Sequence, residues 1–132
     1  MKKLVILLSL LALSLSASAQ DAKENRRVID AKFVAISTSM VAASIFDMET
    51  TFSAIKNPGV HEGNPIMRPF VNAGRPATYA FIGGMDAGTL WLAYRAKKNP
   101  NPAIRKLWWL APAIATATHA FAGGANLRFT FH

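Results

Sequence analysis

The sequence predicts an all-α membrane protein, in which a bundle of three transmembrane helices follows a cleavable N-terminal signal peptide. Three long apolar stretches cover residues 33–55, 77–94 and 107–127. At about 1.5 Å per residue, each is close in length to the roughly 30 Å of a hydrocarbon core. None alternates as a strand does, and none carries the wide charged face of a soluble surface helix. Only 17% of the residues are charged, below the roughly 25% of an average soluble domain.

Residues 1–19 have the order of a secretory signal peptide. A cationic start is followed by an apolar run at 4–13 and by the small residues Ala17-Ser18-Ala19. Cleavage is expected between Ala19 and Gln20, which leaves a single helical membrane domain at 20–132. The alternative is an uncleaved anchor, but residues 4–19 are fewer than the roughly 20 needed to span a bilayer.

Small residues recur at four-residue spacing on all three stretches. They are Ala35, Ser39, Ala43 and Asp47 on the first, Ala80, Gly84 and Gly88 on the second, and Ala120 and Gly124 on the third. Such lines allow helix backbones to approach closely in lipid. We therefore expect Gly84 and Gly88 to lie at a helix contact, which a second copy of the chain could supply.

Aromatic and basic residues support the membrane interpretation. Trp91 and Tyr94 end the second stretch, Trp108 and Trp109 open the third, and five basic residues lie between them. Trp and Tyr favour the headgroup level, with basic residues just outside it. The net charge of +8 therefore indicates anionic lipid rather than nucleic acid. The alternative is a soluble secreted helical domain with Trp residues in its core.

The orientation in the membrane receives two conflicting indications. The signal peptide favours a carboxyl terminus inside the cell, whereas the excess of Lys and Arg in the second loop favours the opposite arrangement. An active leader normally dominates, so we expect the carboxyl terminus inside.

Three ionisable residues on three different stretches lie at a similar depth. Asp47, Asp86 and His119 fall about 12 to 14 Å from the membrane face that carries the first loop. Because an unpaired ionised group is costly in hydrocarbon, we expect these residues to form one polar layer.

Three interpretations of this layer remain open. A polar latch that fixes helix packing is favoured, followed by a layer that relays protons or binds a substrate, and then by a metal or hydrolytic site. No local signature of a metalloprotease or a serine hydrolase is present. The absence of cysteine excludes disulfides, thiolate metal sites and thiol catalysis. We therefore assign no catalytic residue and expect no cofactor, while metal binding is left open.

The first loop (56–75) is the most motif-like part of the chain. Thr51 follows Asp47 by one helical turn, and the loop then carries Glu62, Asn64 and Pro65. This combination of D-x-x-x-T and E-x-N-P resembles a family of small bacterial membrane proteins of unknown function. The resemblance implies three or four membrane helices and no known activity. The signal peptide, and Asp86 where a basic residue is expected, are departures from the family pattern.

These observations predict a small multi-pass protein of the bacterial cytoplasmic membrane, with a structural or accessory role rather than an enzymatic one. The expected partners are the lipid bilayer and either a second copy or another membrane protein, but not nucleic acid. The alternative is an intramembrane enzyme or transporter that uses the Asp/His layer.

Overall fold

The chain forms three long helices, with a short helix at each end of the bundle. A computed structural model describes residues 27–131. The helices are α2 (Ala31–Ala54), α3 (Arg68–Asn72), α4 (Arg75–Lys98), α5 (Pro102–Lys106) and α6 (Leu110–Thr130). About 75% of the described residues are helical and none of them lies in a strand, so the all-α prediction is confirmed. The predicted signal peptide and its cleavage site lie outside the described residues.

Each long helix coincides largely with one predicted apolar stretch, but the boundaries differ. Helix α4 extends to Lys98 and so includes basic residues that were expected in a loop, while α6 begins at Leu110 rather than at residue 107. The short helices α3 and α5 were not predicted. Both begin beside a proline, because the fixed φ angle of proline suits the first turn of a helix.

Local sequence explains where the helices begin and end. The side chain of Asp30 caps α2 by accepting a 2.9 Å hydrogen bond from the amide of Phe33. Gly74, with a φ of 96°, provides the turn between α3 and α4, a conformation that other residues adopt only at a cost. Asn99 leaves the helical conformation before Pro100, as expected of a residue that precedes proline.

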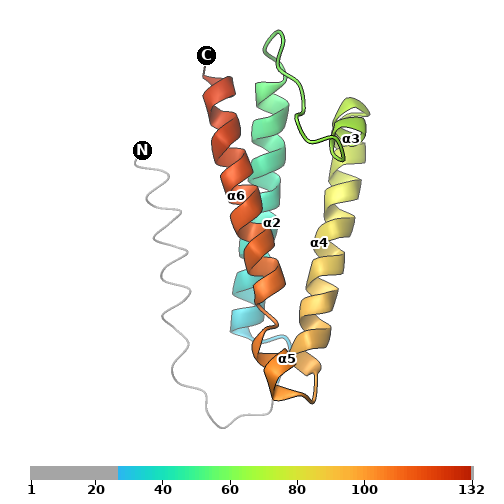
Figure 1. The fold of residues 1–132 in the computed structure, drawn as a ribbon, viewed down its shortest axis with the longest axis vertical. Helices are drawn as coiled ribbons and strands as arrows, with labels where there is room; N and C mark the ends of the chain where they lie inside the picture. The colour runs from blue at the N-terminus through green and yellow to red at the C-terminus, as the bar shows by residue number, and fades with distance from the viewer. Residues whose placement is uncertain (1–26, 132) are drawn as a thin grey trace.

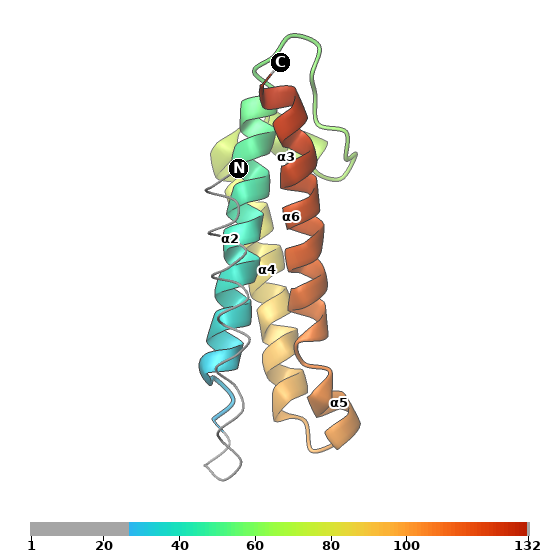
Figure 2. The same ribbon diagram turned by 90° about the vertical axis from the view of Figure 1, so that its left-hand side faces the viewer.

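Helices α2 and α6 pack side by side along most of their length, and α4 lies against both of them (Figures 1 and 2). The first loop and α3 lie at the same end of the bundle as residue 131, which we call the loop end. The beginning of α2, which Asp30 caps, and helix α5 lie at the opposite end (Figure 1), which we call the basic end.

The interior of the bundle combines apolar side chains, such as Met48, Phe52 and Ile82, with the polar side chains of Ser44, Thr50, Thr78 and Asp86. The largest fully buried side chains are those of Met40, Ser44, Thr78 and Pro112. Among the described helices, only α2 is long and apolar enough to cross a membrane by length and composition, with a mean hydropathy of 1.3. Helices α4 and α6 contain several glycine and threonine residues together with Asp86, His119 and Asn126, and all of these residue types have negative hydropathy. The crossing of a membrane by all three helices therefore stays a prediction.

Candidate functional site

The first polar contact in the interior joins α2 to α6 through Asp47. Its Oδ2 lies 2.9 Å from Nδ1 of His119, and its Oδ1 accepts a 3.3 Å hydrogen bond from Nδ2 of Asn126. The same amide group donates to Oγ1 of Thr51 at 2.8 Å. We call Asp47, Thr51, His119 and Asn126 the Asp47 cluster. Two of the three residues of the predicted layer, Asp47 and His119, thus lie in direct contact.

The third residue of the predicted layer, Asp86, makes a separate contact. It is buried on α4, and its Oδ1 accepts a 3.1 Å hydrogen bond from Oγ of Ser44, one turn before Asp47 on α2. Within the described residues, 27–131, no hydrogen bond links Asp86 to Asp47 or His119. His119 is nevertheless close enough to Asp86 for an electrostatic interaction. The predicted layer therefore consists of two contacts on neighbouring turns of α2. The sequence analysis did not identify Ser44 as a partner.

Close approach of α2 and α6 at this level depends on Gly123. A Cβ atom at this position would lie 2.5 Å from Cδ1 of Phe46 and 3.0 Å from Cα of Asp47. The missing side chain therefore lets α6 approach α2 closely enough for His119 and Asn126 to reach Asp47. Sequence reasoning had singled out Gly124 instead.

Gly84 and Gly88 do not pack against another helix of the described chain. Both are exposed, and a Cβ atom at either position would have nothing within 4 Å. The expectation of a packing contact is therefore wrong for the described part of a single chain, because this face of α4 points away from α2 and α6. Contact of this face with a second copy stays a prediction.

A further polar contact joins α2 to α4 near the loop end. Glu49 forms an ion pair with Arg75 and accepts a 2.6 Å hydrogen bond from the hydroxyl of Tyr79. The Arg75 guanidinium also lies 4.8 Å from the ring centroid of Phe52. These residues were not predicted, because Arg75 was counted only as a charge of the first loop.

The E-x-N-P motif holds the first loop together. Oε1 of Glu62 accepts a 2.8 Å hydrogen bond from the amide of Asn64, whose Oδ1 accepts a 3.0 Å bond from the amide of Ile66. Pro65, between them, is exposed. The guanidinium of Arg68 donates to the carbonyl of Glu62. Glu62 therefore supports the loop and makes no hydrogen bond to the Asp47 cluster.

A hollow of about 460 Å³ separates this loop from the helix ends. Its lining includes Thr51 and Asn126 from the Asp47 cluster, together with His61 and Glu62 from the loop. The Asp47 cluster thus borders an open space at the loop end of the bundle.

At the basic end, Lys97 connects α4 to the start of α2. Its ammonium group forms an ion pair with Asp30 and lies 4.3 Å from the ring centroid of Trp108. Partial burial alone would raise the pKa of Asp30. However, the hydrogen bond and the charge of Lys97, together with the amide of Phe33, hold this pKa below its usual range.

The chemistry available at the Asp47 cluster is that of an Asp–His pair. The carboxylate orients the imidazole through Nδ1, and Nε2 makes no hydrogen bond within the described chain, so this nitrogen is available to exchange a proton.

Among residues 27–131, no group of three His, Asp or Glu side chains lies close enough to hold a metal ion. Comparison with protein-family models, curated proteins and solved structures gives no match. The resemblance carried by Asp47, Thr51 and the E-x-N-P motif therefore stays a prediction.

Proposed function

We propose that the chain is a small integral membrane protein of the bacterial cytoplasmic membrane, and that α2, α4 and α6 all cross the bilayer. Its role is structural or accessory rather than catalytic. The observation that carries the proposal is the distribution of side chains between the surface and the interior.

Large apolar side chains point outward on all three long helices. Those more than half exposed include Val34 on α2, Met85, Trp91 and Leu92 on α4, and Ile114 and Phe121 on α6. Phe121, near the middle of its helix, is 80% exposed. A water-soluble protein rarely leaves so much apolar surface uncovered, whereas acyl chains solvate it readily.

Polar side chains lie between the helices. The Asp47–His119 and Ser44–Asp86 contacts connect α2 to α6 and to α4. Polar residues within a membrane generally face the bundle interior and find partners there. We infer that these contacts act as latches, which fix the rotation and register of three helices that lack a hydrophobic driving force for association.

Alkaline carbonate extraction of native membranes tests membrane integration. The chain should remain with the membrane pellet, and release into the supernatant would contradict the proposal.

Single-cysteine labelling tests the number of crossings, because the chain has no native cysteine. The exposed positions Ile29, Ile66 and Ala103 can each be replaced by cysteine. They lie before α2, between α2 and α4, and between α4 and α6. With an impermeant maleimide on spheroplasts and inverted vesicles, Ile29→Cys and Ala103→Cys should label from one face and Ile66→Cys from the other. If α2 alone crosses the membrane, Ile66→Cys and Ala103→Cys will share a face.

Proton transfer through the Asp47 cluster is a second candidate function. It is favoured by the free Nε2 of His119 and by the hollow that borders Thr51 and Asn126. Liposomes that contain the protein and a pH-sensitive dye should dissipate a pH gradient faster than protein-free liposomes, and Asp47→Asn should remove the difference. Ser39→Ala is a suitable control, since among the described residues the Ser39 hydroxyl bonds only within its own helix, to the carbonyl of Ala35. Equal leak with and without protein would eliminate this candidate.

A further inference from the structure

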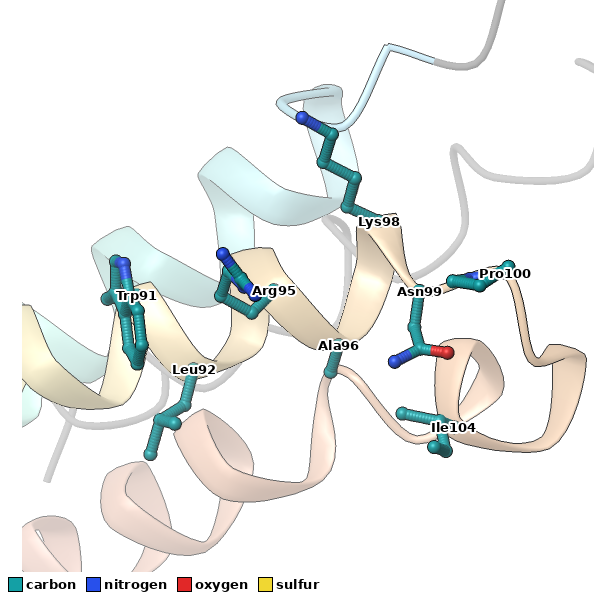
Figure 3. A pocket seen from close by; sticks show the side chains of 8 residues that line it. All are labelled: Trp91, Leu92, Arg95, Ala96, Lys98, Asn99, Pro100 and Ile104. Atoms are coloured by element: carbon teal, nitrogen blue, oxygen red, sulfur yellow. The ribbon is translucent and has the colours of Figure 1, made fainter.

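The basic end of the bundle carries a hollow of about 600 Å³ beside the corner between α4 and α5 (Figure 3). Arg95 and Lys98 extend from α4 on one side, in the same direction as Trp91, and Leu92 and Ile104 lie on the opposite side. The hollow therefore combines two cationic groups with apolar walls.

Positive charge is concentrated at this end. Its cationic side chains are those of Arg27, Lys32, Arg95, Lys97, Lys98, Arg105 and Lys106, and Asp30 is the one carboxylate among the described residues there. Lys97 is the partner of Asp30. Within residues 27–131, Arg95 and Lys98 form no ion pair, and both residues are exposed.

The arrangement of Arg95 fits a position at a membrane surface. Its guanidinium lies 5.6 Å from the ring centroid of Trp91, which is itself 58% exposed. A cation held against an exposed indole presents charge and apolar surface side by side. Trp is the residue that favours the headgroup region, and basic residues lie just outside it.

We propose that this hollow binds the phosphate group of an anionic phospholipid. Arg95 and Lys98 contact the phosphate oxygens, and Trp91, which extends to the same side of α4, lies along the upper part of an acyl chain. The inference rests on the proposed membrane location and adds to it a specific lipid class and a specific site. Charge complementarity and the adjoining apolar wall both favour a phospholipid over a free anion.

Binding can be measured on the full chain in an uncharged detergent, with short-chain phosphatidylglycerol as the probe. We expect saturable binding of phosphatidylglycerol and much weaker binding of phosphatidylcholine, because the quaternary ammonium group of phosphatidylcholine offsets its phosphate charge and is repelled by Arg95 and Lys98. The double variant Arg95→Gln/Lys98→Gln should bind on the order of tenfold more weakly, because each basic residue near an anionic headgroup contributes to the attraction. Unchanged binding by this variant would overturn the proposal.

A matched double variant distinguishes binding at this hollow from diffuse electrostatic attraction of the lipid to the basic end. Lys32→Gln/Lys106→Gln removes the same charge from the same end but leaves the hollow intact, and it should retain the affinity of the unmodified chain. An equal loss in both double variants would overturn the proposal, as would equal binding of inorganic phosphate. Carbonate extraction of both variants reports membrane integration separately, so a failure of lipid binding can be distinguished from a failure of the membrane proposal.

Discussion

Individual serine residues in α2 show how similar side chains take different roles. Ser37 and Ser39 donate to the carbonyls four residues earlier, at Phe33 and Ala35, and so remain within their own helix. Ser44 instead donates to Asp86 on α4. A helical serine can bond either to the carbonyl four residues earlier or to another group. Ser44 bonds to Asp86 because α4 brings this acceptor within reach.

This ambiguity limits what the sequence can predict at the site. The depth of Asp47 and His119 along their stretches was enough to predict that they would be close. It could not predict that Asp86 turns toward Ser44, because depth gives no information about rotation about the helix axis. Gly123 was missed for the same reason.

A double-mutant cycle should show strong coupling between Asp47 and His119. We expect Asp47→Asn and His119→Ala to be non-additive by about 1 to 2 kcal/mol in the free energy of unfolding in detergent, because they share a hydrogen bond that involves a carboxylate. The cycle of Asp86→Asn with His119→Ala serves as the comparison and should couple more weakly, since no hydrogen bond joins that pair. Stronger coupling of His119 to Asp86 than to Asp47 would contradict the assigned contacts.

The Asp30–Lys97 pair should make stability depend on acidity. Since the folded state lowers the pKa of Asp30 from its ordinary 3.8, the pair stabilises the fold above that pH, and this contribution is lost as the pH falls through the lowered pKa. Lys97→Gln should therefore be less stable than the unmodified chain at pH 7, and the difference should shrink below pH 3.8. Denaturant unfolding in detergent across this range measures it. Lys106→Gln is the control, and a difference that stays constant down to pH 2 would count against the pair.

At the scale of elements, α2 and α6 meet along a seam that alternates steps of three and four residues. On α6, His119, Gly123 and Asn126 lie against α2. Pro112, Thr116 and Thr130 continue the same spacing, and all six residues are buried or half-buried. A line of strict four-residue spacing turns gradually around the helix, whereas alternating steps stay on one face. The predicted Ala120–Gly124 line lies one residue after His119 and Gly123, about 100° further around the helix, and both of its residues are exposed.

Substitutions of the adjacent Gly123 and Gly124 should distinguish the face of α6 that packs against α2 from its exposed face. Gly123→Ala should destabilise the bundle by about 1 to 3 kcal/mol, because its Cβ would overlap Phe46 and force the helices apart. Gly124→Ala and Gly88→Ala, whose added atoms would meet nothing, should be neutral or slightly stabilising, because alanine has the higher helix propensity. Thermal unfolding in detergent compares the three variants. If Gly124→Ala were the most damaging, the rotation of α6 described above would be wrong.

For the whole molecule, the length and continuity of the apolar stretches were sufficient to predict three long helices in their order. The short helices α3 and α5 were missed, because five-residue helices bury too little surface to leave a pattern. The sequence could identify the basic loop, but not that Arg95 and Lys98 belong to α4 and border a hollow. That arrangement depends on where α4 ends.

The outward position of the large apolar side chains also has a consequence for mutational tolerance. In a water-soluble bundle, interior positions are the restrictive ones and the surface accepts almost any polar residue. Here the surface should be restrictive in its own way: Val41, Ile45 and Ile114 should accept any apolar residue and reject Asp or Lys. Interior positions such as Ser44 and Thr116 should reject bulk rather than polarity. A deep mutational scan of protein abundance in cells would display this reversal, and tolerance of charge at the three outward positions would indicate that water, not lipid, surrounds the bundle.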